Sequence, residues 1–192
     1  MKQLQNYTVF DIETTGFSGT KDKITELGAI KVREGKIIAT FNALLDWKIP
    51  IPKHITEITH IDNALIDAEG INPDFAIEEF VHFLSLDTII GHNVLKFDIP
   101  FILGNFPGLH LLNFDSRTID TAALYKAKKL NLELVSVQDM KDILGKVYYG
   151  VKYSVDTACI EFNIDKTKVS QHRALGDCVL TKQIYENLTA IN

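Results

Sequence analysis

The stretch YTVFDIETTG, residues 7–16, joins an apolar run to a pair of acids. The run is apolar on both faces, which is typical of a central strand in a sheet. Side chains alternate along a strand, so Asp11 and Glu13 should point to the same face, about 7 Å apart. Two carboxylates placed in this way repel each other unless a positive charge lies between them. The stretch alone leaves two interpretations open: a charged site, or a solvated Glu13 with Asp11 capping the next turn.

The pattern around this strand predicts an α/β fold with a five-stranded mixed sheet flanked by helices. Strands are expected at 7–13, 24–32, 37–45, 87–92 and 116–121, with the second strand antiparallel to its neighbours. Helices are expected at 72–85, 94–103, 122–130, 137–144, 153–162 and from about 173 to 188. Asn72 is the expected N-cap of the first helix, and Pro100 fits the second only near its first turn or at a kink. The length of 192 residues suits a single domain spanning 1–192.

The composition narrows the class of protein without deciding it. The chain is 46% hydrophobic, which is enough for a core, and its net charge is −5. A nucleic-acid binder usually has a basic domain, although local charge and bound metal can override the total. Cys159 and Cys178 show no metal-ligand spacing and are expected to be buried free thiols. No signal segment or membrane span is evident, so we expect a cytoplasmic protein.

Two further acids lie in apolar surroundings. Asp98 lies in GHNVLKFDIPF, residues 91–101, and Asp177 in HRALGDCVL, residues 172–180. An unpaired ionised carboxylate is costly in such a place, and the nearby bases are few, Lys96 and Arg173. With the first pair this makes four carboxylates, whose charge would match two divalent cations. Hard cations with oxygen ligands, Mg²⁺ or Mn²⁺, are therefore favoured.

Three motifs in this order resemble those of the DEDDh exonucleases. They are FDIETTG followed by ITELGAI, then GHNVLKFDIPF, and then HRALGDCVLT, in which a histidine precedes the last acid by five residues. Each motif is short, but the ordered set is specific, and the resemblance covers residues 7–188. The family is that of the DnaQ-like 3′–5′ exonucleases, which includes proofreading domains such as the DNA polymerase III epsilon subunit. The resemblance implies a ribonuclease H-like fold.

The resemblance also implies roles for individual residues. Asp11, Glu13, Asp98 and Asp177 would hold two Mg²⁺ or Mn²⁺ ions, and His172 would be the general base that accepts a proton from the attacking water. The alternative for His172 is a loop residue that caps the final helix. Candidate substrate contacts are Thr14, Thr15, Glu26, His92, Asn93 and Phe97.

Two of these candidate contacts, Glu26 and Phe97, and one further acid, Asp120, each have a structural alternative. Glu26 could be an ordinary sheet carboxylate, and Phe97 could fill the core rather than pack on the terminal base. Asp120 precedes a helix, so N-capping is favoured over catalysis.

The function implied is a metal-dependent 3′–5′ exonuclease that hydrolyses single-stranded DNA to mononucleotides, in proofreading or repair. A polymerase subunit is the candidate partner. One alternative is an exoribonuclease that trims RNA 3′ ends with the same site, although the resemblance to the DnaQ-like family favours DNA. A non-catalytic binding subunit on the same fold is a third hypothesis, disfavoured because all four acids and the histidine are present.

The segment 130–153 is longer than the usual family connection. Residues 117–152 contain seven Lys or Arg against four Asp or Glu, a local excess in an acidic chain. Lysines could contact phosphates there and tyrosines could stack on bases. The favoured alternative is that Tyr148 and Tyr149 pack an additional helix and that the lysines are solvated.

Overall fold

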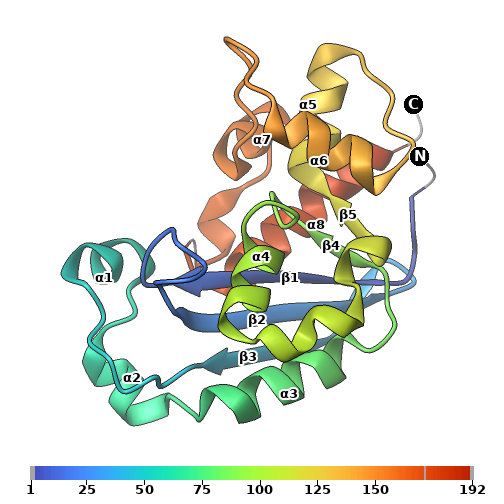
Figure 1. Cartoon of the computed structure of the whole chain (residues 1–192). Helices are drawn as coiled ribbons and strands as arrows, with labels where there is room; N and C mark the ends of the chain where they lie inside the picture. Colours follow the sequence, from blue (N-terminus) through green and yellow to red (C-terminus); the bar gives the residue numbers. More distant parts are fainter. Residues whose placement is uncertain (1–2, 171, 191–192) are drawn as a thin grey trace.

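The centre of the computed structural model, which describes residues 3–170 and 172–190, is a mixed sheet of five strands (Figure 1). Its spatial order is β3-β2-β1-β4-β5. Strand β2 is antiparallel to β1 and β3, whereas β1, β4 and β5 are parallel. The predicted strands and the antiparallel second strand are thereby confirmed. Their bounds are Tyr7–Thr14 (β1), Ile24–Arg33 (β2), Lys36–Leu44 (β3), Ile89–Gly91 (β4) and Thr118–Asp120 (β5).

Eight α-helices accompany the sheet in the described residues. They are Lys53–Thr59 (α1), Asn63–Glu69 (α2), Pro73–Leu84 (α3), Asp98–Asn105 (α4), Thr121–Leu130 (α5), Val137–Gly145 (α6), Val155–Glu161 (α7) and Ala174–Thr189 (α8). Short 3₁₀ helices cover Pro107–Leu112, Phe114–Arg117 and Lys166–Lys168. The helices α1 and α2 and the 3₁₀ helices Pro107–Leu112 and Lys166–Lys168 lie where the sequence pattern predicted no element, whereas Phe114–Arg117 overlaps the start of the strand predicted at 116–121, which begins only at Thr118. Two turns of helix are too short to show a 3.6-residue periodicity, which is why the pattern missed them.

Local chemistry explains where two of the predicted helices begin. The side chain of Asn72 accepts hydrogen bonds from the backbone N–H groups of Asp74 and Phe75, and Pro73 occupies the first helical position of α3. Helix α4 begins at Asp98, so Pro100 lies in its first turn, where its missing N–H has no partner to lose. The expected roles of Asn72 and Pro100 are confirmed, although α4 begins at Asp98 and not at residue 94, where the predicted helix began.

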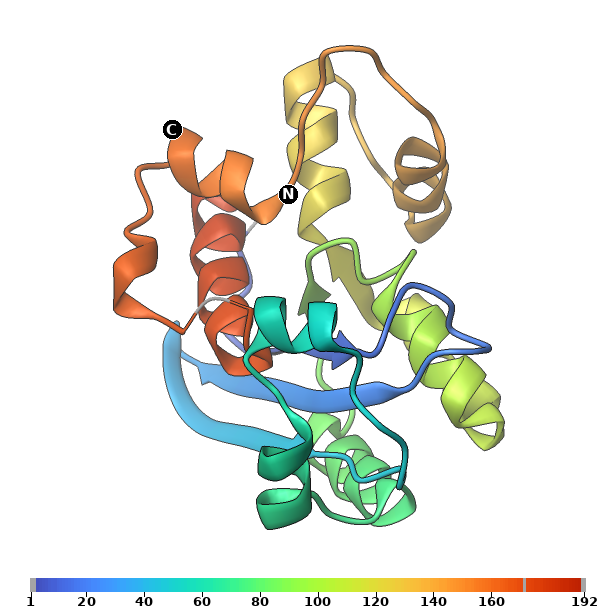
Figure 2. The ribbon, with the colours of Figure 1, turned by 90° about the vertical axis from the view of Figure 1, so that its left-hand side faces the viewer.

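Helices cover both faces of the sheet, with α8 on one face and α3 and α4 on the other (Figures 1 and 2). Alternation along β1 decides which side chain meets which layer. Tyr7 and Val9 pack under α8, and the Tyr7 ring lies 5.2 Å from that of Tyr185. Phe10 points the other way and meets Phe80 of α3 at 5.4 Å. Each of these buried side chains stabilises the fold by about 1.5–3 kcal/mol.

None of the described helices combines the length and the apolar character that crossing a membrane requires.

Candidate active site

Three carboxylates, two from β1 and one from the C-terminal helix α8, meet on the α8 face of β1. Asp11 and Glu13 follow Tyr7 and Val9 on that face, at the end of the strand. Because α8 runs in the opposite direction, its first turn lies over this end and brings in Asp177. One carboxylate oxygen from each of the three residues lies within 4.8 Å of the others. The pairing predicted from alternation along the strand is thus present in the structure.

Helix α8 can come this close because β2 carries a glycine where the two meet. Gly28 pairs with Asp11 across the β1–β2 ladder. A Cβ atom at this position would lie 2.6 Å from the Cβ atom of Ala174, the first residue of α8. A larger residue would therefore push away the end of the helix that carries Asp177.

The fourth acid, Asp98, comes from α4, in the helix layer on the other face of the sheet. Asp98, the first residue of α4, is 4% exposed, and its Oδ1 accepts a hydrogen bond of 3.2 Å from the backbone N–H of Ile12. This N–H is available because β4 pairs with β1 only at Thr8 and Val9. Since Ile12 lies between the two acids of β1, the hydrogen bond fixes Asp98 beside them.

The four acids cannot all remain ionised without a counter-charge. Burial, reinforced by the charges of the other acids, raises the pKa of Asp11 well above its usual value. Burial and the charge of Asp177 raise the pKa of Glu13 to about 8. Burial also raises the pKa of Asp98 to about 8 and that of Asp177 to about 6. Such a cluster of oxygen donors matches the ligand preference of Mg²⁺ and Mn²⁺, so the residues fit the divalent metal that the sequence predicted.

Glu26 is anchored inside the protein. It pairs with Glu13 across the β1–β2 ladder and is fully buried. Its oxygens accept hydrogen bonds from Arg173 Nε at 3.1–3.2 Å, from Arg173 Nη2 at 2.7 Å and from the backbone N–H of Ala174 at 3.0 Å. In this structure Glu26 therefore has no exposed surface for a substrate. It acts as a sheet carboxylate that ties the start of α8 to β2.

His172 lies just before α8, on the outside of the molecule. The residue is exposed and has a φ of 55°, in the left-handed region. The preceding backbone packs on α8 at Gly176, where a Cβ atom would lie 1.9 Å from the carbonyl oxygen of Ser170. His172 and Asp177 line one pocket of about 230 Å³, closed on its other side by the start of α7. The histidine is therefore next to one of the four acids and open to solvent.

The two threonines at the end of β1, Thr14 in the strand and Thr15 directly after it, shape the next loop. The hydroxyl of Thr14 donates to the carbonyl oxygen of Gly16 at 2.6 Å, and that of Thr15 accepts from the backbone N–H of Lys23 at 2.9 Å. Both residues are buried. Their side chains are thus used to hold the loop, and any contact with a substrate would come from the backbone.

The GHN motif separates into a structural histidine and an accessible asparagine. The ring of His92 is within hydrogen-bonding distance of Thr121 Oγ1 at 2.9 Å and of the carbonyl oxygen of Tyr153 at 2.8 Å. Burial lowers its pKa to about 4, so the ring is neutral at physiological pH. Asn93 has a φ of 63° and lines, with His92, a pocket of about 530 Å³. Of the pair, Asn93 is the better placed to meet a ligand.

Phe97 mainly packs against neighbouring side chains and projects little into solvent. Its half-buried ring lies 5.1 Å from that of Phe101 and contacts the main core. Core filling, one of the two roles considered for it, matches this position.

Asp120 has a second role that the sequence did not reveal. It caps α5 as predicted, by accepting from the N–H groups of Ala122 and Ala123. The same carboxylate accepts from the backbone N–H groups of Asn93 and Leu95, each at 3.0 Å. It therefore fixes the loop that leads from β4 to Asp98. The only sequence signal for this contact was the position of Asp120, an acid at the end of a strand next to the strand that contains the GHN motif.

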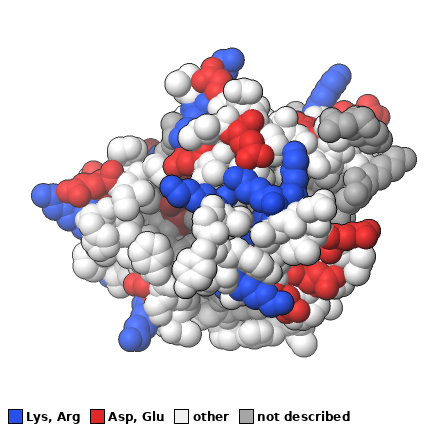
Figure 3. Space-filling model, turned by 90° about the horizontal axis from the view of Figure 1, so that it is seen from above, with Lys and Arg blue, Asp and Glu red and all other residues white. Residues whose placement is uncertain are grey.

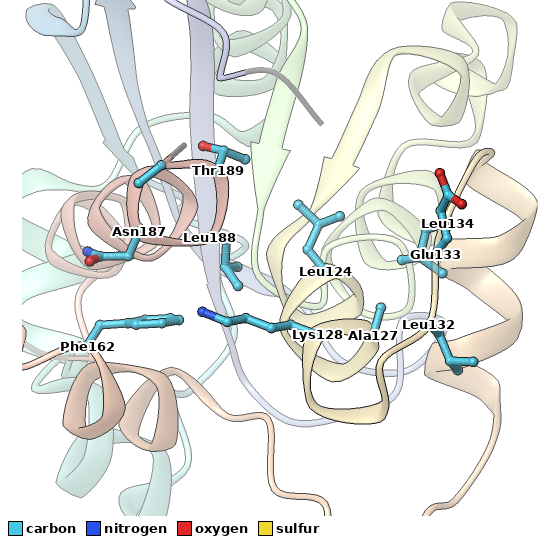
Figure 4. A pocket seen from close by; sticks show the side chains of 11 residues that line it. Leu124, Ala127, Lys128, Leu132, Glu133, Leu134, Phe162, Asn187, Leu188 and Thr189 are labelled. Carbon is cyan, nitrogen blue, oxygen red and sulfur yellow. The ribbon is translucent and has the colours of Figure 1, made fainter. Parts of the chain in front are cut away.

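A larger cavity, of about 770 Å³, lies away from the acids (Figure 4). Leu124, Phe162 and Leu188 are among its lining residues, at the C-terminal end of α8, whereas Asp177 is in the first turn of that helix. It takes no part in the acid cluster.

Comparisons with known proteins agree on one family. A family model described as an exonuclease, named for RNase T, matches residues 8–185. The PolC-type DNA polymerase III of Clostridium perfringens is 39% identical over 134 residues, which cover 68% of this chain and 9% of that protein. The chain spans about a tenth of the length of the curated relatives it matches.

Two solved structures share the fold. Exonuclease X in complex with 5′ overhanging duplex DNA is 22% identical, with a TM-score of 0.62, and 94% of this chain and 89% of that chain are covered. Exonuclease I of Escherichia coli in complex with a dA16 oligonucleotide is 18% identical, with a TM-score of 0.68, and 94% and 40% are covered. These similarities confirm the predicted ribonuclease H-like fold.

Proposed function

The chain belongs to the RNase T exonuclease family, and we propose that it is a metal-dependent 3′–5′ exonuclease that releases mononucleotides from single-stranded DNA. The observation that carries this proposal is the convergence of three carboxylates within 4.8 Å, with Asp98 fixed beside them and His172 next to Asp177. An acidic cluster of this kind has no evident purpose in a stable fold without a cation, because its members repel each other.

Asp11, Glu13, Asp98 and Asp177 would hold two Mg²⁺ or Mn²⁺ ions. When bound, such ions supply charge stabilisation on the attacking and leaving oxygens of the phosphodiester and make water a better nucleophile. The carboxylates would lose their retained protons as the cations bind, because the positive charge favours their ionised form. Glu26 would keep the site in register, since it holds the helix end that carries Asp177 against β2.

His172 would accept the proton of the attacking water. Histidine is the side chain that most often serves as a general base. Its exposed position in the pocket shared with Asp177 gives the imidazole access both to the site and to solvent, where the proton is finally released.

The terminal nucleotide would lie between the loop after β1 and Asn93. The backbone at Thr14 and Thr15 and the side chain of Asn93 are the proposed contacts. DNA is proposed rather than RNA because the relatives are DNA polymerases and the fold neighbours named above hold DNA. The polymerase relatives also support a proofreading role in the cytoplasm, with a polymerase as partner.

One experiment tests the direction of degradation, the preference for DNA or RNA and the requirement for metal together. A single-stranded oligonucleotide, labelled at either end and made as DNA or as RNA, is digested with Mg²⁺, with Mn²⁺ or in excess EDTA. We expect stepwise shortening from the 3′ end of the DNA, early release of the 3′ label as mononucleotide, and no reaction in EDTA. First release from the 5′ label, faster cleavage of RNA, or full activity in EDTA would each contradict the proposal.

A further inference from the structure

Residues 146–152 form a loop within the connection between α6 and α7, and a buried lysine holds it in place. Lys126 is 1% exposed, and its Nζ donates to the carbonyl oxygen of Lys146 at 2.6 Å. The same ammonium lies over two rings, 5.1 Å from the centroid of Tyr148 and 4.5 Å from that of Tyr153. His92 adds its contact of 2.8 Å to the carbonyl oxygen of Tyr153. Fixed at both ends, the loop presents its remaining side chains in a set arrangement.

The side chains that point outward are aromatic, apolar and basic. Tyr149 is 99% exposed and Val147 is 83% exposed, with Lys146 and Lys152 exposed on either side. The expectation that Tyr148 packs the added helix agrees with its half-buried ring, but Tyr149 does not pack in this way. Single exposed apolar residues are common, so exposure alone indicates little. An unpacked aromatic ring between two lysines is, however, the combination that binds a single strand, by stacking on a base and pairing with phosphates.

The pocket beside the loop and the pocket of the active site are neighbours that share lining residues. The pocket of about 530 Å³ is lined by Asn93, Lys152, Ser154 and Val155, among others. Ser154 and Val155 also line the pocket that contains His172 and Asp177. The face that carries α5, α6 and α7 shows Lys and Arg side chains gathered near its centre, beside acidic side chains that are partly recessed (Figure 3).

We propose that the strand upstream of the terminal nucleotide leaves the active site through this pocket and runs over the 146–152 loop. Lys146 and Lys152 would contact its phosphates, and Tyr149 would stack on one of its bases. The proposal rests on the proposed exonuclease function and adds to it a path for the substrate. The occupant is a single strand because a polyanion complements the lysines and because the path continues from a site for a strand end.

The test compares a small substrate that fills only the catalytic site with longer substrates that extend along the proposed path. The p-nitrophenyl ester of thymidine 5′-monophosphate occupies the catalytic site alone, whereas oligothymidylates from dT2 to dT12 extend progressively along the path. The variants are Tyr149→Ala and Lys152→Ala. Their matched controls are Leu86→Ala, which truncates a side chain 92% exposed, and Lys36→Ala, an exposed lysine after the β2–β3 turn.

We expect Tyr149→Ala to lower kcat/KM for dT12 at least fivefold, since stacking of one base on an aromatic ring corresponds to roughly 5- to 150-fold in binding. Ester hydrolysis should stay within twofold of native, and the defect should appear only beyond a threshold length. Lys152→Ala should reduce the slope of log KM against log salt by about 0.7, the value for one lost phosphate contact on a single strand. Both controls should behave as native.

Two results would contradict the proposed path of the strand. One is an unchanged kcat/KM for dT12 in both variants. The other is an equal loss on the ester and on dT12, which would mean that the loop acts on the site rather than on the strand. If the native protein hydrolyses neither substrate, the exonuclease function fails. Fluorescence anisotropy of labelled dT12 then still tests the path, because weaker binding by the two variants alone supports it and equal binding refutes it.

Discussion

The metal-free protein should lose stability as the pH rises from 7 to 8.5, because its acids are then forced to ionise together. Glu13 and Asp98 have pKa values raised to about 8 by burial, whereas carboxyl groups in the unfolded chain titrate near 4. A group whose pKa is raised in the folded state contributes its full stabilisation at pH values below its pKa in the unfolded chain. This contribution falls as the pH rises above that pKa, and it is lost once the pH has passed the pKa of the folded state, here near 8. His92, whose pKa is lowered to about 4, is neutral throughout this window and does not contribute.

The magnitude follows from proton linkage. Each proton that the folded state binds in excess lowers the free energy of unfolding by about 1.4 kcal/mol per pH unit. For a chain of 192 residues, 1 kcal/mol corresponds to about 2–4 °C in Tm. One retained proton therefore predicts a fall in Tm of roughly 3–6 °C per pH unit.

The assay is thermal unfolding in EDTA at several pH values between 7 and 8.5, for the native protein and for Asp11→Asn. The variant removes the central acid, so its Tm should match or exceed the native value and its slope should be shallower. Glu78→Gln, which removes an exposed acid of α3, should keep the native slope. Saturating Mg²⁺ should raise Tm and abolish the fall, since a ligand at 100 times its Kd stabilises by about 2.7 kcal/mol. A metal-free Tm that stays flat or rises over this window would refute the reasoning.

Four further substitutions should affect the site in different ways. Glu26→Gln should destabilise the protein by about 1.5–3 kcal/mol, because it weakens the charge-assisted hydrogen bonds from Arg173, and Arg173→Lys should cost less; urea denaturation measures both. His172→Ala should lower kcat by about 10²–10⁴-fold while Mn²⁺ affinity is retained, and a kcat within about threefold of native would make the histidine structural. Gly28→Ala should cost about 1–3 kcal/mol and lower kcat, because the added methyl group overlaps Ala174; native stability and turnover would show that α8 can shift without harm.

Much of the fold was predictable because its signals are local. Alternation in residues 7–13, the turn at 33–36 and the cap at Asn72 each involve a few neighbouring residues, and the structure confirms the elements that they predicted. Helices α1 and α2 were missed for the same reason, since seven residues carry little periodicity and α1 has no side-chain cap.

The site was predictable in its acids but not in the contacts that support them. Asp98 and Asp177 stand out because a carboxylate in an apolar run needs a reason. The pairing of Glu26 with Arg173 joins residues 147 positions apart, and no local pattern encodes it. His92 illustrates the opposite failure, because its place in a motif suggested a substrate contact although both its ring nitrogens have partners within the protein.

The central claim is that the four acids form a metal site on which hydrolysis depends. It is tested most directly by measuring bound Mn²⁺ and release of mononucleotide from single-stranded DNA in the same samples as Mn²⁺ is added. Free Mn²⁺ is followed by electron paramagnetic resonance. We predict that turnover rises with occupancy of two ions per chain and that Asp11→Asn loses both tight binding and turnover. Turnover in the metal-free protein, or native turnover by Asp11→Asn, would contradict the claim.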